Sequence, residues 1–382
     1  MTLRTLELHD FRAHAESSIE LAPNINLFVG PNGAGKTNVL EAAHYLCLSK
    51  SFLTTTDRYV LREGAAFFQV KGEFIGTTRS QVAVRLVFAP REGKRMFVNG
   101  TPLERMADIV GLLPVVVFEP GMQVLTTGAP ETRRRFLDNI LSQAKPAYLE
   151  SLINYRRALR QRNEFLYRNR HRPVGQALLA PLDQVLMNAG SRIIDVRLRF
   201  LNEFKAYLRK AWEHLGTEIE EPTISYRGLI AEDGPCAEED VRLAFANELR
   251  RVRDREWAWG RTCAGPHRDE LIFKLAGLEV RRFASTGQHR TFGIALKLAK
   301  YFYLDARLEE SPMLLLDDVF DSLDQRRTEA IVGLLLSPAT GQSLITTADA
   351  GNLKEFISGP QNRYIHVRQG RVTPASRPPP AG

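Results

Sequence analysis

Apolar and polar positions follow distinct patterns along this chain, and these patterns predict several β-strands before any motif is considered. Segments without a regular polar alternation are typical of strands buried in a parallel sheet, and they lie at residues 25–29, 115–118, 313–316 and 343–347. Segments in which every second residue is apolar predict an antiparallel patch, and they lie at residues 68–74, 82–88 and 95–98. Leu3, Leu6, Leu8 and Phe11 predict a further strand near the start. The pattern therefore indicates an α/β fold that carries an antiparallel β patch.

From Pro130 to about Trp259 the apolar spacing changes to that of helices. Residues 148–169 and 182–212 predict two long helices, but their heptads do not persist far enough for an extended coiled coil. A compact helical lobe is expected instead. We predict an α/β head in two parts, at residues 1–125 and 261–373, a helical lobe at 126–260, and a proline-rich disordered tail at 374–382.

A glycine-rich loop between the first buried strand and the following helix fits the phosphate-binding pattern G-x-x-x-x-G-K-[ST]. Its backbone N–H groups and the N-terminal end of the helix favour phosphate oxygens. Lys36 should lie on the β- and γ-phosphates of a nucleotide, and Thr37 should give its hydroxyl to Mg²⁺. The alternative is a chance glycine turn. The predicted ATP-binding loop comprises Gly30, Pro31, Asn32, Gly33, Ala34, Gly35, Lys36, Thr37 and Asn38.

Two carboxylates, Asp317 and Asp318, end the apolar run at 313–316, which places them at the carboxyl edge of the predicted parallel sheet. There Asp317 would lie on the metal side of the nucleotide, and Asp318 would orient or deprotonate the attacking water. A plain turn at the end of a strand is the alternative. Asp349 follows the next buried strand, where a sensor of the γ-phosphate could lie, and Arg12 ends the first strand, where it is either a nucleotide contact or a surface arginine.

The chain has 52 Lys and Arg residues against 44 Asp and Glu residues, a net charge of +8. A basic excess of this kind favours a polyanionic partner such as nucleic acid. Arginines crowd one predicted helix and the segment after it, where they are either DNA contacts or a solvated face. They are Arg156, Arg157, Arg160, Arg162, Arg168, Arg170 and Arg172, of which the first four are the predicted DNA-binding residues.

Cys47, Cys236 and Cys263 are odd in number and far apart, a pattern that suits a reducing compartment better than a disulfide framework or a zinc site. No apolar stretch is long enough to span a membrane, and the first residues lack the apolar core of a signal peptide. We expect a cytoplasmic protein.

Residues 271–275 and 278–283 predict a hairpin, which leads into the turn Ser285-Thr286-Gly287-Gln288 and then into a helix at 292–308. A small, polar turn that opens a helix can bind an anion, although such a turn is usually only a cap. Together with the phosphate loop and the Asp317-Asp318 strand, which is followed by Asp321-Ser322-Leu323-Asp324, this turn resembles the ATPase head of the ABC superfamily.

Two further segments resemble the signature segments of the RecF family of bacterial recombination mediators. The first runs from Glu119-Pro120 through Gly128-Ala129-Pro130 to 133–138, which reads Arg-Arg-Arg-Phe-Leu-Asp, and the second is 265–269, which reads Gly-Pro-His-Arg-Asp. The resemblance extends from residue 3 to about 370. Leu53, Gly121 and Thr126 depart from the pattern of that family.

The RecF resemblance implies an ATP-dependent homodimer that binds double-stranded DNA, hydrolyses ATP slowly and, with a RecR partner and alongside RecO, promotes loading of RecA at gapped DNA. It also implies that Ser285, Gly287 and Gln288 of one subunit contact the ATP of the other, with Asp324 at the same interface.

Three other classes of protein share some of these motifs. An ABC transporter ATPase subunit would carry its phosphate loop and acidic strand closer together, whereas here a whole helical lobe intervenes. A long-armed chromosome-maintenance ATPase would need a longer insert and a Cys-x-x-Cys hook. A DNA-binding scaffold with a structural, non-hydrolysed ATP stays open, and measurement of ATP turnover would separate it from an ATPase.

Overall fold

A computed structural model describes residues 1–76, 81–170, 178–216, 220–230, 237–320, 323–349, 351 and 359–374. Its backbone contacts divide the chain into two compact units, which are described separately. Unit 1 comprises residues 1–122, 214–216 and 300–382, and unit 2 comprises residues 123–213 and 217–299. Residues 261–299, which the sequence pattern assigned to the head, therefore group with the helical segments of unit 2.

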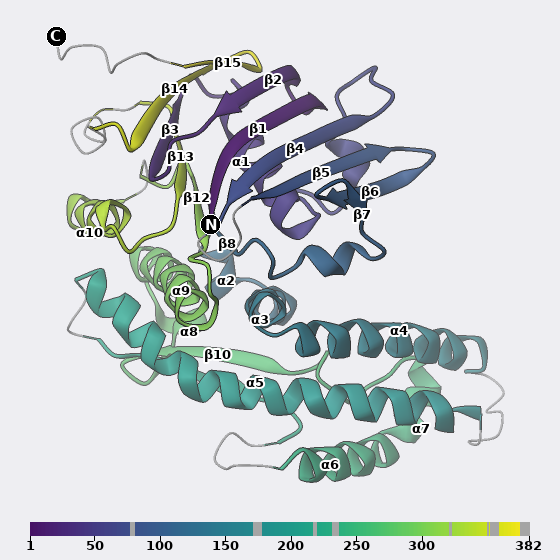
Figure 1. Cartoon of the computed structure of the whole chain (residues 1–382). Helices are drawn as coiled ribbons and strands as arrows, with labels where there is room; N and C mark the ends of the chain where they lie inside the picture. The colour runs from purple at the N-terminus through teal and green to yellow at the C-terminus, as the bar shows by residue number, and fades with distance from the viewer. Residues whose placement is uncertain are drawn as a thin grey trace. The chain divides into compact units, whose positions relative to one another are not determined.

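Unit 1 contains a six-stranded sheet in the order β15-β14-β3-β13-β12-β8 (Figure 1). The strands are β3 (Ile25–Val29), β8 (Val115–Phe118), β12 (Met313–Asp317), β13 (Ser343–Thr347), β14 (Asn362–Arg368) and β15 (Arg371–Pro374). All neighbours pair in parallel except β14 and β15. The four segments found in the sequence are the strands β3, β8, β12 and β13. Every residue of these strands is buried, which explains why they lack a regular polar alternation.

The second sheet of unit 1 is antiparallel, in the order β2-β1-β4-β5-β6-β7. Its strands are β1 (Thr2–Phe11), β2 (His14–Glu20), β4 (Phe68–Ile75), β5 (Val82–Ala89), β6 (Gly93–Val98) and β7 (Thr101–Pro102). The helix α1 (Lys36–Leu48) shares a core with residues of both sheets, including Leu40, Phe68 and Leu315. Two 3-10 turns, η1 (Asp57–Tyr59) and η2 (Met106–Ile109), and α10 (Gln325–Leu336) complete the unit. The α/β head with an antiparallel β patch is therefore confirmed.

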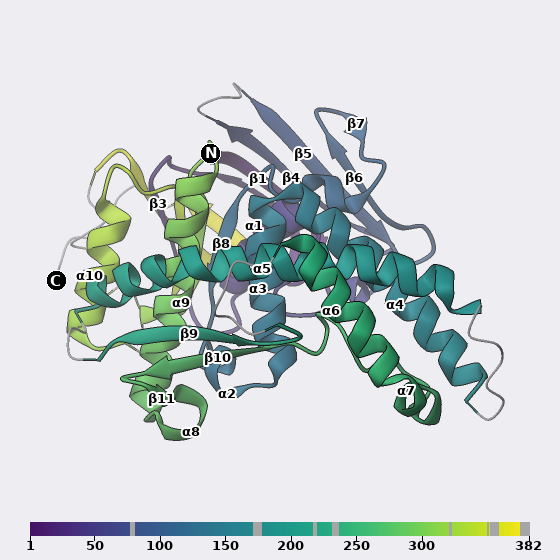
Figure 2. The same ribbon diagram turned by 90° about the horizontal axis from the view of Figure 1, so that it is seen from below.

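Unit 2 is mainly helical and also holds a small sheet in the order β11-β10-β9 (Figure 2). The helices are α2 (Val124–Thr127), α3 (Pro130–Ala144), α4 (Pro146–Arg168), α5 (Ala180–His214), α6 (Glu238–Arg251), α7 (Arg253–Trp259), α8 (Val280–Phe283) and α9 (Thr286–Arg307). The strands are β9 (Pro222–Arg227), β10 (Glu270–Leu275) and β11 (Leu278–Glu279). Proline at the first position of α3 and of α4 gives each helix a sharp start, because proline fits the first turn and lacks an N–H that would need a partner.

Three local predictions differ from the structure. β9 lies inside the region predicted to be all helical, and it pairs with β10 from Glu270↔Arg227 to Leu275↔Pro222. The predicted second strand of the hairpin ends at Glu279, since Val280–Phe283 forms a helical turn that buries Val280 and leaves Phe283 exposed. α9 starts at Thr286 rather than at Phe292. Of the predicted tail, Pro374 ends β15, and 375–382 lie outside the described residues.

Candidate nucleotide site

The glycine-rich loop lies between β3 and α1, as its position between a buried strand and a helix predicted. Gly35 has a φ of +101°, a left-handed conformation that side chains other than glycine rarely adopt, and it caps α1. A Cβ at Gly30 would lie 2.0 Å from the carbonyl oxygen of Val367, so only glycine fits there. The loop surrounds a cavity of about 310 Å³, which is lined by Asn32, Gly33, Gly35, Lys36, Thr37, Asn38 and Asp318.

The side chain of Lys36 is hydrogen-bonded to the backbone of this loop. Its Nζ donates hydrogen bonds to the carbonyl oxygens of Gly30, at 2.9 Å, and Pro31, at 3.3 Å. The side chain is 4% exposed and nevertheless lines the cavity. Its hydrogen bonds go to neutral carbonyl oxygens and not to a carboxylate, so a phosphate in the cavity can accept from this buried ammonium, whose charge is costly to desolvate.

Thr37 and Asp317 lie 280 positions apart in the sequence and meet in the structure. The hydroxyl of Thr37 donates to Oδ1 of Asp317 at 2.7 Å, and the hydroxyl of Thr346 donates to the same oxygen at 2.8 Å. Burial raises the pKa of Asp317, whereas the two hydroxyl groups and the charge of Lys36 oppose that rise. The sheet order explains the meeting, since β13 lies between β3 and β12 and all three strands end at one edge.

Asp318 follows the end of β12 in a left-handed conformation, with a φ of +43°. Its backbone N–H donates to the hydroxyl of Thr346 at 3.0 Å, so Thr346 connects both aspartates. A non-glycine residue held with positive φ is uncommon and costs conformational energy. Here the conformation accompanies a side chain that lines the cavity of the loop.

His14 supports the loop from β2, and no sequence motif pointed to it. Its Nε2 lies 3.0 Å from the carbonyl oxygen of Gly35, and its Nδ1 lies 2.9 Å from the hydroxyl of Ser17. Burial lowers the pKa of His14, although hydrogen bonds to Gly35 and Gly370 oppose this. The only available signal in the sequence was a histidine within an alternating strand, which more often reflects a buried core residue than a functional one.

Two further predicted nucleotide contacts, Arg12 and Asp349, have partners within unit 1. The guanidinium of Arg12 forms a two-bonded pair with the buried carboxylate of Glu41, at 2.9 and 2.8 Å, and donates to the carbonyl oxygen of Tyr59. Asp349 is exposed, and its side chain accepts from the N–H of Gly351 at 2.9 Å. Neither residue lines the cavity of the loop.

The turn at Ser285 is a capping box at the start of α9 in unit 2. The N–H of Gln288 donates to the hydroxyl of Ser285, and the N–H of Ser285 donates to Oε1 of Gln288 at 2.7 Å. Gln288 also donates to Glu220 at 2.8 Å, while Ser285 and Gly287 are exposed. Asp324 caps α10 of unit 1 in a similar way, accepting from the N–H of Arg327. Asp321 and Ser322 lie outside the described residues.

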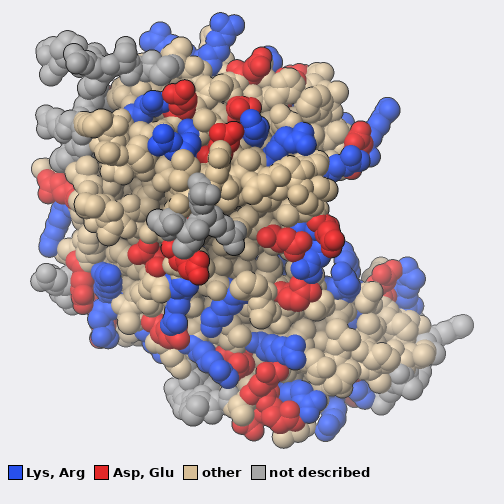
Figure 3. Space-filling model, in the orientation of Figure 1, with Lys and Arg blue, Asp and Glu red and all other residues tan. Residues whose placement is uncertain are grey.

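The predicted DNA-binding arginines of α4 separate into two groups. Arg156, Arg157 and Arg160 are exposed. Arg162 is 1% exposed and bonds to Asp183 and Glu256, each at 2.7 Å, so the prediction that it contacts DNA is wrong: it is a buried structural residue. Arg172 lies outside the described residues. Basic and acidic side chains are interspersed over the face seen in Figure 3.

Comparison with known proteins gives a consistent result over the full length. Residues 2–369 match the family model described as the RecF/RecN/SMC N terminal domain. The chain is 50% identical to the DNA replication and repair protein RecF of Salinibacter ruber, over 390 aligned positions that cover 100% of this chain and 93% of that protein. It is 40% identical to the protein of the same name from Chloroherpeton thalassium, over 93% of this chain and 97% of that one.

Solved structures agree with this. The fold is similar to that of the recombination mediator protein RecF-ATP in the RecFOR pathway, with a TM-score of 0.91, 27% identity and 98% of both chains covered. It is also similar to an Smc head domain from Pyrococcus furiosus, with a TM-score of 0.58 at 14% identity, a likeness of fold alone. The described part of the chain contains no helix that is both long and apolar enough to cross a membrane.

Proposed function

Since this chain belongs to the RecF family of DNA replication and repair proteins, we propose that it binds ATP at the loop 30–38 and acts as a recombination mediator. The observation that carries the ATP site is that Lys36, Thr37 and Asp318 line one cavity, with Asp317 bonded to the hydroxyl of Thr37. The similarity to the RecF-ATP structure over nearly the whole chain supports the same assignment.

Mg²⁺ fits the oxygens at this edge of the sheet. Thr37 supplies a hydroxyl and Asp317 a carboxylate, 2.7 Å apart, and both are the hard ligands that Mg²⁺ prefers. When bound, the ion would neutralise charge on the β- and γ-phosphates. Asp318 then orients or deprotonates the water, and a low rate of ATP hydrolysis is expected. The alternative is that ATP is a structural ligand that is not hydrolysed, and measurement of ATP turnover distinguishes the two.

We further propose that ATP closes a homodimer. In this dimer Ser285, Gly287 and Gln288 of one subunit face the ATP of its partner, and Asp324 lies at the same interface. The exposure of Ser285 and Gly287 supports this, because a contact across a dimer requires an accessible turn. The capping box holds the turn in one conformation before the partner arrives.

The dimer would bind double-stranded DNA and, with RecR-type and RecO-type partners, help to load RecA at gapped DNA. The basic excess of the chain and the exposed arginines of α4 support binding to phosphates. Within the described residues no ion pair reaches Arg157 or Arg160, so these two cations are available. Replacing both with glutamine should reduce the slope of log K against log salt by roughly 0.9 for each DNA phosphate that an arginine no longer neutralises. An unchanged slope moves the DNA-binding surface away from α4.

The decisive test of the ATP site is Lys36→Ala. The variant loses the side-chain cation of the loop, and each charge-assisted hydrogen bond that disappears should weaken ATP binding about tenfold or more. Binding is measured by titration with a fluorescent ATP analogue in the presence of Mg²⁺. Lys71→Ala is the matched control, since Lys71 is a half-buried lysine of the same unit whose ion pair with Glu7 lies on β4 and β1.

Both variants must retain the circular dichroism spectrum of the wild type for the comparison to count. Normal ATP affinity in a folded Lys36→Ala protein would remove the loop from the proposed function.

A further inference from the structure

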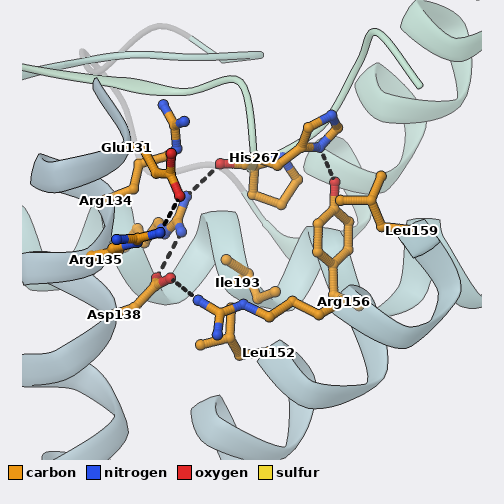
Figure 4. A pocket seen from close by; sticks show the side chains of 12 residues that line it. Glu131, Arg134, Arg135, Asp138, Leu152, Arg156, Leu159, Ile193 and His267 are labelled. Atoms are coloured by element: carbon orange, nitrogen blue, oxygen red, sulfur yellow. Dashed lines mark hydrogen bonds and ion pairs between the residues drawn. The ribbon is translucent and has the colours of Figure 1, made fainter. Parts of the chain in front are cut away.

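Two segments with a recognisable sequence pattern have no place in the ATP site described above. They are 133–138, at the start of α3, and 265–269, before β10. In unit 2 these segments come together and line one cavity of about 390 Å³, together with side chains from α4 and α5 (Figure 4). This volume lies in the range of small-molecule sites.

Charged residues dominate one side of this cavity. Arg134, Arg135, Arg156 and Arg197 line it with Glu131 and Asp138, so its lining carries more positive than negative charge. His267 is neutral at physiological pH, because burial lowers its pKa to about 4. Its Nδ1 lies 2.6 Å from the hydroxyl of Tyr155, and its Nε2 lies 3.3 Å from the carbonyl oxygen of Thr262.

The guanidinium of Arg197 is bonded to other groups of the protein. It is 2% exposed and bonds to Asp138 at 2.8 Å, to Asp269 at 3.3 Å and to the carbonyl oxygen of Pro266 at 2.9 Å. Tyr148 donates to the same oxygen of Asp138 at 2.6 Å. Although burial disfavours its charge, Arg197 and Tyr148 hold the pKa of Asp138 below its ordinary value. Asp138 is therefore satisfied without any further cation.

Arg156 is such a further cation. It extends across the cavity toward Asp138 in Figure 4, and its Nη2 lies 3.0 Å from the second oxygen of that carboxylate. The side chain of Arg156 is 60% exposed and that of Asp138 is 10% exposed, but Asp138 keeps its bonds from Arg197 and Tyr148 when Arg156 moves away. In the pair between Arg135 and Glu131 both side chains are exposed, and such a pair contributes about 0–1 kcal/mol. An incoming anion can therefore recruit both guanidiniums, since each is accessible to solvent and neither is needed to satisfy a buried carboxylate.

Arg134 adds a third donor. Its Nη1 donates to the backbone carbonyl oxygen of Asp269 at 2.7 Å, and no carboxylate forms an ion pair with it among the residues that the structure describes. Burial, with a smaller contribution from the charge of Arg197, lowers the pKa of Arg134, whereas the charges of Asp269, Glu270 and Glu131 oppose that shift.

We propose that this cavity binds a phosphate ester, with Arg134, Arg135 and Arg156 donating to its oxygens. A phosphate group presents oxygens in several directions and can accept from several guanidiniums at once, whereas a carboxylate is satisfied by a single planar fork. Leu152, Leu159 and Ile193 add apolar side chains to the lining, suited to the organic part of the ester. The site is independent of the proposed ATP loop, since all its residues belong to unit 2.

The first experiment uses the full-length protein with Arg156→Gln and, as matched control, Arg209→Gln. Arg209 belongs to the same unit, is 61% exposed and has one exposed partner, Glu221. Calorimetric titration with inorganic phosphate should show an affinity lower by up to about tenfold in Arg156→Gln and an unchanged affinity in Arg209→Gln. Phosphate held at the loop 30–38 gives the same background in both proteins. Arg135→Gln serves as a second variant should Arg156→Gln fail to fold.

Three further ligands distinguish the source of the phosphate: a deoxynucleoside monophosphate, a duplex with 5′-phosphate ends and the same duplex with 5′-hydroxyl ends. If the site binds the phosphate at a strand end, the 5′-phosphorylated duplex should bind the wild type more tightly than the 5′-hydroxyl duplex, and Arg156→Gln should remove that difference. If it binds internal DNA phosphates, Arg156→Gln should lower the affinity for both duplexes equally. If it binds a free nucleotide, Arg156→Gln should lower the affinity for the monophosphate alone.

Crystals soaked in tungstate, a phosphate mimic, supply direct evidence. Anomalous density within hydrogen-bond distance of Arg134 and Arg156 is expected. The proposal is overturned if tungstate occupies other sites and leaves this cavity empty, or if no phosphate ligand distinguishes Arg156→Gln from Arg209→Gln.

Discussion

Replacing Arg162 with methionine should destabilise unit 2 severely, even though the residue belongs to an arginine-rich helix that reads as a solvated or DNA-binding face. Arg162 donates to Oδ1 of Asp183 at 2.7 Å, to Oε2 of Glu256 at 2.7 Å and to the hydroxyl of Thr262 at 2.9 Å. Both Arg162 and Glu256 are 1% exposed. Arg162→Met therefore leaves a buried carboxylate without its cation.

The magnitude follows from that geometry. Removing one partner of a buried, hydrogen-bonded ion pair costs about 3–5 kcal/mol, because the remaining charge stays desolvated and uncompensated. Glu256 keeps one bond, from the N–H of Cys263 to its Oε1 at 2.7 Å, which places the expected loss within this range rather than above it. Replacing Glu256 with glutamine in the same protein should restore part of the stability, since it removes the unpaired charge.

Tryptophan fluorescence during urea unfolding is the suitable assay. All three tryptophans, at 212, 257 and 259, belong to unit 2, and Trp257 packs against Phe165 of α4. Arg157→Met is the control, because Arg157 is exposed and lies on the same helix, and its substitution should change stability by less than about 0.5 kcal/mol. Should Arg162→Met be as stable as Arg157→Met, the assignment of Arg162 as a structural residue would be refuted.

Three other outcomes are expected. Asp318→Asn should keep ATP bound while slowing its hydrolysis, because it retains the shape of the side chain but loses the base; equal turnover rates would remove Asp318 from the mechanism. Ser285→Arg should bind ATP as a monomer and fail to dimerise, and an equimolar mixture with Lys36→Ala should crosslink at low salt better than either variant alone, since one composite site is then intact; a monomer unable to bind ATP would place the turn in its own subunit's site. Burial lowers the pKa of His267 from 6.5 to about 4, so between these pH values the unfolded chain binds a proton that the folded chain does not; the stability of unit 2 should therefore fall by about 3 kcal/mol as the pH drops through that window, and an equally steep loss in His267→Gln would contradict this.

Features that depend on neighbouring residues could be predicted from the sequence. The loop 30–38 has fixed spacing because a tight backbone turn around phosphate needs glycine at set positions, and a helix follows it, as predicted. The four segments without a regular polar alternation indicate parallel strands because strands covered on both faces have no polar side. The carboxylates at 317 and 318 follow from the rule that the carboxyl ends of such strands form the functional edge.

Predictions from local sequence patterns were wrong at positions whose burial depends on segments distant in the sequence. Arg162 lies in the same arginine-rich stretch as Arg156 and Arg160. It is buried because α5, α7 and the segment 260–263 supply Asp183, Glu256 and Thr262 as its partners. The hairpin after β10 ends at Glu279 because the chain buries Val280 rather than continuing an alternating strand. β9 was missed because its pairing partner lies about 45 residues further along the chain, from Glu270.

The phosphate loop, the acidic strand end and the strands that carry them thus follow from the amino-acid order alone, because each depends on chemistry within a few residues. Which distant groups meet is decided by the folded chain. Sheet order brings Asp317 to Thr37 across 280 positions, and helix packing brings Arg134, Arg156 and His267 around one cavity. A side chain's burial and charge partners are set by long-range packing, and no local pattern encodes the position of a residue a hundred places away.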